Sequence, residues 1–105
     1  MGKIKWTEKA SSHLQIIYEY IAEDSKIYAT RFIKSLILST KKLKSMPKCG
    51  RKVPEFEDTD FREVIFRDYR IIYRISGKNK DIEILSVFHS ARDLKKAVSE
   101  EWELR

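Results

Sequence analysis

The chain has 105 residues, and its 22 Lys and Arg against 16 Asp and Glu leave a formal charge of +6, with 42% hydrophobic residues. This length allows one domain, residues 1–105, and the apolar content argues against intrinsic disorder. A single cysteine, Cys49, excludes an internal disulfide framework and zinc sites built from paired cysteines. The sequence contains no apolar run of about 18 residues, the length that a membrane span requires. We therefore expect a protein of the reducing cytoplasm.

The excess positive charge is concentrated in the middle of the chain. Residues 41–74 carry 10 basic and 6 acidic side chains, whereas residues 1–40 carry 6 and 4 and residues 75–105 carry 6 and 6. A polyanion or a strongly acidic protein would be attracted to such a segment. For lysines on a helix, a simpler interpretation is a solvated helix face.

The first half of the chain predicts a short strand followed by two helices. In residues 4–6 two apolar residues alternate with Lys, which indicates a strand with one buried face. Thr7 can cap an amphipathic helix over about residues 8–24. A second amphipathic helix is expected from about residue 25 and should end before Met46, because Pro47 disfavours a helical conformation in the residue before it. The two helices are expected to form a hairpin.

The second half predicts a loop, three strands and a last helix. Residues 47–60 contain two prolines, a glycine and four acidic residues, which indicates a loop. Segments rich in β-branched and aromatic residues predict strands at 61–66, 69–75 and 82–89, joined as two antiparallel hairpins. After residue 89, a capping pattern and a new apolar stripe predict the last helix.

The order β-α-α-β-β-β-α predicts an α+β fold in which the helical hairpin packs on one face of a mainly antiparallel four-stranded sheet. Hydrophobic stripes predict one core shared by hairpin and sheet, formed by Leu14, Ile17, Phe32, Leu36, Ile71 and Tyr73. Side chains alternate along a strand, so Arg70 and Arg74 share the face opposite Ile71 and Tyr73. That second face is expected to be partly open and could hold a site.

Several kinds of site are excluded by the sequence. The three glycines are scattered, so there is no glycine-rich phosphate-binding loop. His13 and His89 lie on separate predicted elements with no obvious third ligand, so neither a metal nor another cofactor is expected. His13 lies beside the apolar stripe of the first helix and is interpreted as structural or merely exposed.

The remaining candidates for chemistry lie on the last three strands and the loop before them: Glu55, Arg62, Arg67, Arg70, Arg74 and His89. A metal-free ribonuclease would use a base for the 2′-hydroxyl, an acid for the leaving 5′-oxygen and a cation for the phosphorane. Glu55, His89 and Arg70 could take these roles if Arg70 and His89 share one sheet face. Structural alternatives stay open, in which Glu55 pairs with Arg51 or caps a turn, Arg70 protects a sheet edge and His89 closes the sheet.

Four segments occur in an order and spacing typical of a known family. They are residues 46–55 (Met-Pro-Lys-Cys-Gly-Arg-Lys-Val-Pro-Glu), residues 62–63 (Arg-Glu), residues 69–75 (Tyr-Arg-Ile-Ile-Tyr-Arg-Ile) and residues 84–93 (Ile-Leu-Ser-Val-Phe-His-Ser-Ala-Arg-Asp). Together they resemble the RelE/ParE superfamily of bacterial and archaeal toxins. The resemblance extends over the whole chain.

The resemblance implies the toxin of a type II toxin-antitoxin module, held inactive by a cognate acidic antitoxin. RelE-like members cut mRNA in the ribosomal A site without a metal, whereas ParE-like members poison DNA gyrase. For a RelE-like toxin, whose partners are the ribosome and mRNA, the resemblance assigns catalysis to Arg70, His89 and Glu55. RNA-binding residues would then be Arg51, Lys52, Arg62, Arg67 and Arg74.

The sequence departs from the ribonuclease pattern in two ways, so other functions are also considered. The chain continues past His89 into a predicted helix, and it lacks the closely spaced lysine pair of some ribonuclease members. The presence of both Arg70 and His89 favours the metal-independent, ribosome-dependent mRNA endonuclease. The alternatives are a ParE-like DNA gyrase inhibitor and a non-toxic homologue that only binds an antitoxin.

Overall fold

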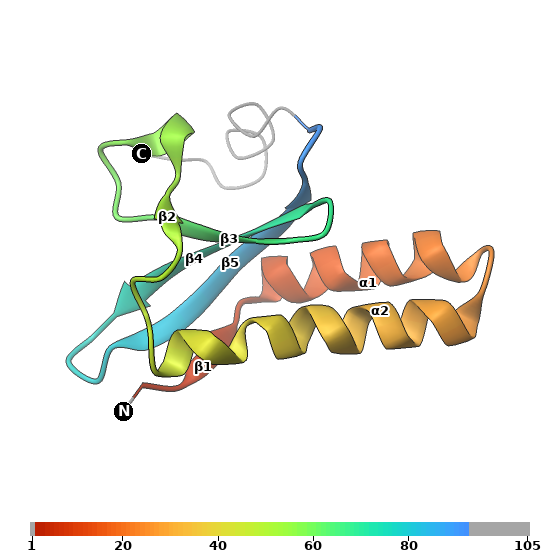
Figure 1. The fold of residues 1–105 in the computed structure, drawn as a ribbon, viewed down its shortest axis with the longest axis horizontal. Helices are drawn as coiled ribbons and strands as arrows, with labels where there is room; N and C mark the ends of the chain where they lie inside the picture. The colour runs from red at the N-terminus through yellow and green to blue at the C-terminus, as the bar shows by residue number, and fades with distance from the viewer. Residues whose placement is uncertain (1, 93–105) are drawn as a thin grey trace.

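The computed structural model describes residues 2–92 (Figure 1). Its elements are β1 (Ile4–Trp6), α1 (Glu8–Ala22), α2 (Lys26–Ser39), the 3-10 helix η1 (Lys41–Lys44), β2 (Arg51–Lys52), the 3-10 helix η2 (Pro54–Phe56), β3 (Arg62–Phe66), β4 (Tyr69–Ser76) and β5 (Asp81–His89). The helix predicted after residue 89 lies outside the described residues.

Hydroxyl side chains cap both helices of the hairpin. Thr7 Oγ1 accepts a hydrogen bond from the Ala10 N–H at 3.1 Å, and Ser25 Oγ accepts one from the Tyr28 N–H at 3.1 Å. Each bond satisfies a backbone donor that the first helical turn leaves unpaired. The helices therefore begin close to where the sequence predicts, and they run side by side (Figure 1). No helix within residues 2–92 is long and apolar enough to cross a membrane.

The prediction that the second helix continues until Pro47 stops it at Met46 is wrong at its C-terminal end. α2 ends at Ser39, and the chain continues as η1. The Thr40 hydroxyl donates to the Ile37 carbonyl at 2.7 Å, and the Thr40 N–H donates to the same carbonyl at 3.1 Å. These bonds tighten the last turn into 3-10 geometry. Leu43 is nevertheless fully buried, so the apolar stripe continues through η1.

The sheet has five strands in the order β1-β5-β4-β3-β2. β1 pairs with β5 in parallel, and the other pairs are antiparallel. The α+β arrangement is confirmed, but the predicted strand count needs a correction. Arg51 and Lys52, expected in a loop, form β2 by pairing with Glu63 and Arg62. Two adjacent charged residues have no alternating apolar pattern, so periodicity could not reveal this strand.

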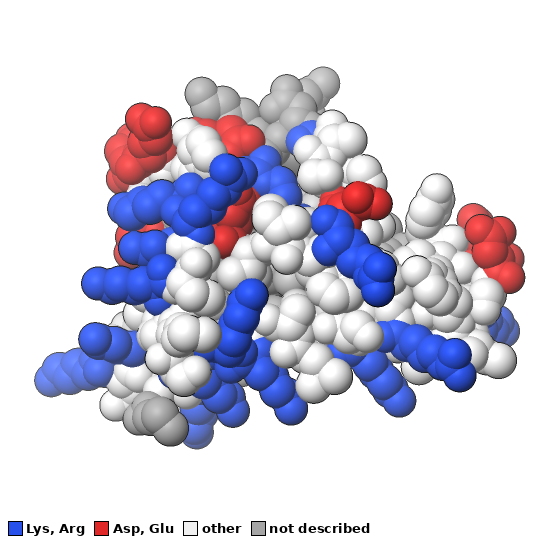
Figure 2. Space-filling model, in the orientation of Figure 1, with Lys and Arg blue, Asp and Glu red and all other residues white. Residues whose placement is uncertain are grey.

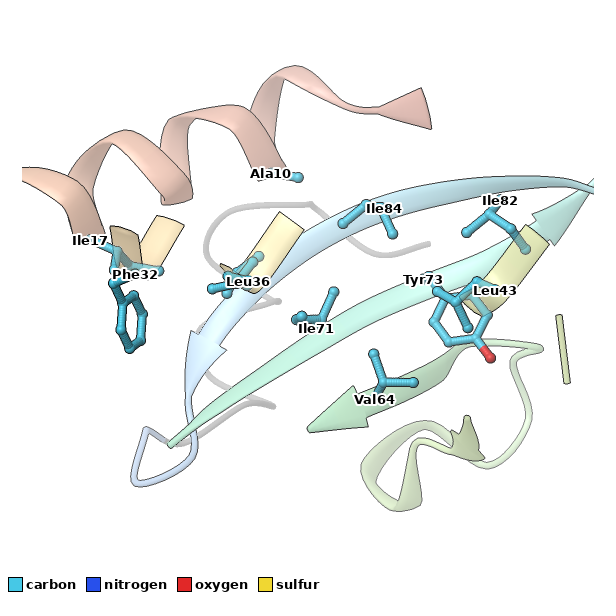
Figure 3. Packing of buried hydrophobic residues seen from close by; sticks show 11 residues of the cluster. Ala10, Ile17, Phe32, Leu36, Leu43, Val64, Ile71, Tyr73, Ile82 and Ile84 are labelled. Carbon is cyan, nitrogen blue, oxygen red and sulfur yellow. The ribbon is translucent and has the colours of Figure 1, made fainter. Parts of the chain in front are cut away.

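The main core lies between the hairpin and one face of the sheet. Figure 3 shows its side chains converging from both helices and from β3, β4 and β5. Most of the predicted shared core belongs to this cluster, namely Ile17, Phe32, Leu36, Ile71 and Tyr73. Leu14 is partly buried and packs against the cluster. The prediction of one core shared by hairpin and sheet is confirmed.

Tyr73 fastens the segment after η1 to this core. Its hydroxyl donates to the Pro47 carbonyl at 2.6 Å and accepts from the Gly50 N–H at 3.0 Å. Burial raises the pKa of the Tyr73 hydroxyl, which keeps its proton available for donation. A Cβ atom at Gly50 would lie 2.5 Å from the Glu63 carbonyl oxygen, so only glycine allows this close approach.

The opposite face of the sheet, here called the outer face, is partly covered by the segment between β2 and β3. A second, smaller apolar cluster forms there from Val53, Ile72 and Phe88, with Phe56, Phe61 and Leu85 packed against it. β5 carries an extra residue at this point, because Ile72 pairs with Ser86 whereas the next residue, Tyr73, pairs with Ile84. The face predicted to be open is therefore open only beyond this cluster.

Candidate functional site

Arg70 is the centre of a charged network on the outer face. Its Nε donates to Glu63 Oε1 at 2.6 Å, and its Nη1 and Nη2 donate to the two carboxylate oxygens of Glu55, each at 2.8 Å. The other oxygen of Glu63 accepts from Arg51 Nε at 2.6 Å. These four residues, which we call the Arg70 network, join β2, η2, β3 and β4 in a chain of alternating charges.

The strand register explains why these residues meet. Glu63 of β3 pairs with Arg51 of β2, and Arg70 of β4 pairs with the residue two positions after Glu63. Paired residues project from the same face, as do residues two apart. Arg51, Glu63 and Arg70 therefore project together from the outer face. The chain then turns through η2, which places Glu55 against the guanidinium of Arg70.

Burial makes this pairing obligatory. The Glu63 side chain is fully buried and that of Arg70 is 9% exposed, and an unpaired charge in such a place would cost several kcal/mol. Hydrogen bonds from Arg70 hold the pKa of Glu55 below its ordinary value, although partial burial opposes them. The pKa of Arg70 is raised above its already high value, chiefly by its hydrogen bonds to Glu55 and to a smaller extent by its hydrogen bond to Glu63. Two guanidinium groups and two carboxylates leave the network without net charge.

This arrangement is better suited to holding the fold together than to stabilising a phosphorane. A catalytic arginine directs its N–H groups at the oxygens that gain charge, whereas Arg70 directs Nε, Nη1 and Nη2 at Glu63 and Glu55. A general base works best with a pKa near the operating pH, and the pKa of Glu55 is shifted the other way. Glu55 does pair with an arginine, as one structural alternative held, but its hydrogen-bond partner is Arg70 rather than Arg51.

His89 lies on the other side of the sheet from Arg70. The β4–β5 register pairs Tyr69 with His89 and Arg70 with Phe88, and adjacent pairs point to opposite faces. The His89 ring meets the Tyr69 ring edge-on, with centroids 5.4 Å apart, on the side of the hairpin. The condition set for the ribonuclease site, that Arg70 and His89 share a face, is therefore not met.

His89 also ends β5. Its Nδ1 accepts a hydrogen bond from the Ala91 N–H at 3.1 Å, and the Ser90 N–H donates to the Asp68 carbonyl at 2.7 Å. In the neutral ring the proton then belongs on Nε2, because Nδ1 acts as the acceptor. The exposed ring of His89 is therefore part of the turn that closes this end of the sheet, in keeping with the structural alternative for this residue.

His13 has a structural role. Its ring is buried, and Nδ1 accepts a hydrogen bond from the Val87 N–H at 3.1 Å. β1 pairs with β5 only at residues 82–84, so it does not reach Val87. His13 instead accepts the Val87 N–H hydrogen bond that a longer neighbouring strand would have accepted. Within residues 2–92, no three His, Cys, Asp or Glu side chains gather in a way that could hold a metal ion.

The five basic residues predicted to bind RNA do not converge on one surface. Each has a partner in the fold: Arg51 binds Glu63, Lys52 binds the Thr59 carbonyl, Arg62 binds the Gly50 carbonyl, Arg74 binds Glu83, and Arg67 lies over the Phe66 ring. Arg51 and Lys52 are adjacent on a strand and therefore point to opposite faces. A single phosphate-binding track through all five residues is not compatible with this geometry.

Positive charge gathers elsewhere on the molecule. Figure 2 shows Lys and Arg along its left edge, at the β4–β5 turn, and along its lower edge, where η1, β1 and α2 lie, whereas acidic side chains gather at the upper left around η2. Exposed lysines of the first region include Lys41, Lys44, Lys48 and Lys80. The basic surface and the neutral Arg70 network are therefore separate features.

The sequence pattern predicts no role for Glu63, the remaining residue of the network, beyond its place in the Arg-Glu pair of residues 62–63. A signal was present, because an acidic residue within an apolar strand must be neutralised if its face is covered. Which arginine does so depends on strand register, and the sequence does not provide it.

Comparison with known proteins gives a match over most of the chain. Residues 4–94 match the family described as the ParE toxin of the type II toxin-antitoxin system parDE. The protein Y4kP of Sinorhizobium fredii (strain NBRC 101917 / NGR234), itself named only as a proposed toxin, is 34% identical over 90 residues, which cover 84% of this chain and 88% of Y4kP.

Solved structures with low sequence identity share the fold. The chromosomal ParDE toxin-antitoxin system from P. aeruginosa contains a chain that matches with a TM-score of 0.69 and 24% identity, over 85% of this chain and 96% of that one. The RelBE2 toxin-antitoxin complex from Mycobacterium tuberculosis matches with a TM-score of 0.62 and 19% identity, over 84% and 96% of the two chains.

Proposed function

This chain belongs to the ParE toxin family of type II toxin-antitoxin systems, and we propose that it acts by binding a protein target, DNA gyrase, rather than by cutting RNA. The observation that carries the proposal is the β4–β5 register, in which Arg70 and His89 project from opposite faces of the sheet. One scissile phosphate cannot contact both side chains in that geometry.

The electrostatics of the Arg70 network support the same proposal. Arg70 is neutralised by two carboxylates, and Glu55 is a weaker base than a free glutamate. An inhibitor that works by binding needs neither a general acid nor a general base. The Arg70 network then serves to hold η2 and β2 against the sheet, so that the surface around them keeps its shape.

We further propose that a cognate acidic antitoxin holds the toxin inactive. The formal charge of +6 and the basic segment 41–74 favour an acidic partner. Among the structural relatives, the P. aeruginosa structure is described as a ParDE toxin-antitoxin system and the M. tuberculosis structure as a toxin-antitoxin complex. A partner bound to the folded toxin would also raise its apparent stability.

One experiment separates the two molecular targets. Purified protein is added to a gyrase supercoiling reaction and, in parallel, to a ribosome-programmed mRNA cleavage reaction in EDTA, with His89→Ala as the variant and thermal melting as the check on folding. We expect wild type and His89→Ala to inhibit supercoiling within about twofold of each other and to leave the mRNA intact, because His89 has no chemical step to perform.

The metal-independent, ribosome-dependent endonuclease is the second candidate. It is favoured by the exposure of His89, which a substrate could reach. The general acid would be the imidazolium form of the ring, and in that form Nδ1 must give up the hydrogen bond that it accepts from the Ala91 N–H. In that mechanism Glu55 must release Arg70 when RNA binds. Cleaved mRNA, with a rate about 10² to 10³ lower in His89→Ala, would establish this candidate and overturn the gyrase proposal.

A non-toxic homologue would behave differently from both. It would leave supercoiling and mRNA unchanged and would not arrest growth when expressed without the antitoxin, yet it would still co-purify with the antitoxin. Growth arrest that disappears when the antitoxin is supplied is the result expected for a functional toxin.

A further inference from the structure

A hollow of about 530 Å³ is lined by the segment after η1 and by the β4–β5 hairpin. These two segments lie at the end of the molecule far from the α1–α2 connection (Figure 1). The lining residues of the hollow are Met46, Pro47, Lys48, Cys49, Ile75 and Lys80. Apolar side chains form its walls, and Lys48 and Lys80 are its two charged groups. We call it the lysine-rimmed groove. It lies apart from the Arg70 network.

The backbone wall of this groove is fixed by side chains of the sheet. The Tyr73 hydroxyl holds the Pro47 carbonyl at 2.6 Å and the Gly50 N–H at 3.0 Å. Arg62 Nη1 donates to the Lys48 carbonyl at 3.3 Å and to the Gly50 carbonyl at 2.8 Å. The groove therefore exists before any ligand arrives, which lowers the ordering cost of binding.

The surroundings of the groove are strongly basic. A neighbouring hollow of about 220 Å³, between β1 and η1, is lined in part by Lys3, Lys41 and Lys44. The carboxylate of Asp81 at this end is already engaged, at 2.8 Å from the Lys3 N–H and at 3.1 Å from the Lys5 ammonium. Figure 2 shows the resulting positive surface at the lower left. A ligand with carboxylates would be attracted here and held by the rim.

We propose that the lysine-rimmed groove binds an acidic peptide segment, which places an apolar side chain between Met46 and Ile75 and its carboxylates on Lys48 and Lys80. An apolar floor with charged groups at the edge matches an acidic peptide with apolar anchors. Nucleic-acid strands are held by aromatic or arginine side chains that stack on bases, and the groove lining has neither. We assign this segment to the antitoxin, and that assignment rests on the proposed function.

Cys49 allows a direct test, because it is the single cysteine of the chain, is exposed and lines the groove. The rate of its alkylation by iodoacetamide is measured with a synthetic 12-residue peptide rich in Glu and containing two leucines. The same peptide with serine in place of leucine, and a 12-nucleotide oligouridylate, are the comparison probes. We expect the leucine peptide to slow alkylation at least fivefold at saturation, and the other two probes to slow it less than twofold.

Charge-reversal variants locate the effect. Lys48→Glu/Lys80→Glu should abolish protection by the leucine peptide. Lys26→Glu/Lys34→Glu, which changes the net charge equally at exposed sites of α2, should retain it. Each variant is compared with its own rate in the absence of peptide, so a changed intrinsic reactivity of Cys49 does not affect the result.

Three results would overturn the inference: no protection by the leucine peptide, equal protection by the serine peptide, or protection by oligouridylate alone, which would make the groove a nucleic-acid site. None of these depends on gyrase or on growth. Conversely, if gyrase inhibition fails while the leucine peptide still protects Cys49, the proposed function is wrong and the groove assignment stands.

Discussion

The two faces of the sheet are stabilised by different forces. On the face that packs against the hairpin, apolar side chains from six elements form one cluster that includes Leu36, Ile71 and Ile84, all fully buried. On the outer face the apolar cluster is smaller, and beside it Glu63 and Arg70 carry buried charges. Burial of apolar area is non-directional and tolerates small shifts, whereas the ion network works only with each donor opposite its acceptor.

This difference has a consequence for function. The inner face is fully occupied with holding the fold, so it offers little to a ligand. The outer face contains groups that in other settings perform chemistry, but in this chain they are paired with one another. Residue type alone therefore overstates the catalytic capacity of the outer face. Mutations of its charged residues should change the stability of the fold more than they change activity.

The largest expected effect concerns the inner face. Phe32→Ala should lower the free energy of unfolding by about 3 to 5 kcal/mol, because it leaves a cavity where the ring meets Phe66 at 5.4 Å and Tyr69 at 5.8 Å. Urea unfolding measures the change. Ile27→Ala is the control, since that side chain is 68% exposed and should cost less than about 0.5 kcal/mol. Equal losses in the two variants would contradict the assignment of the core.

The second prediction addresses the buried charges of the outer face. Glu63→Leu should lower the free energy of unfolding by about 3 kcal/mol, because Arg70 loses its Nε partner in a buried position. Replacing both partners, as Glu63→Leu/Arg70→Met, should recover at least about 1 kcal/mol of that loss. Guanidinium chloride screens charges, so urea unfolding is the appropriate measurement. A double variant no more stable than the single one would show that Glu63 acts through packing alone.

A smaller effect is expected from pH. The pKa of Glu55 is lowered by Arg70 from an ordinary value of 4.5, so the folded state holds this proton less tightly than the unfolded state. The contribution of the pair, about 1 kcal/mol, is therefore fully present above pH 4.5 and lost as the pH falls through the lowered pKa. The difference in unfolding free energy between wild type and Glu55→Gln, measured from pH 7 to pH 3, should decrease in that window. A difference independent of pH would contradict the pairing.

The smallest effect is expected for an exposed pair on the same face. Arg74 Nε lies 2.6 Å from Glu83 Oε1, but the Arg74 side chain is 47% exposed. Arg74→Gln should change the free energy of unfolding by less than about 0.5 kcal/mol, and added salt should reduce even that difference. A loss as large as that of Glu63→Leu would mean that exposure does not decide which ion pairs matter in this sheet.

Much of the candidate site could be anticipated as a set of residues but not as a geometry. Glu55, Arg70 and His89 were all identified from the sequence, and the structure brings Glu55 and Arg70 within hydrogen-bonding distance. The separation of His89 from them follows from one register fact, the pairing of Tyr69 with His89. A shift of one residue would have reversed the outcome, because it moves every side chain of a strand to the opposite face.

The sequence by itself determined the order of α1, α2, β1, β3, β4 and β5, the inner core and the family, because helix caps, apolar periodicity and ordered motifs are local patterns that can be read along the chain. It did not determine β2, whose two charged residues become a strand only when β3 lies beside them. Nor did it determine which carboxylate each arginine binds or where the lysines gather around a hollow. Those contacts join residues distant in the sequence, and strand register and the Tyr73 anchor, which exist only in the folded chain, decide them.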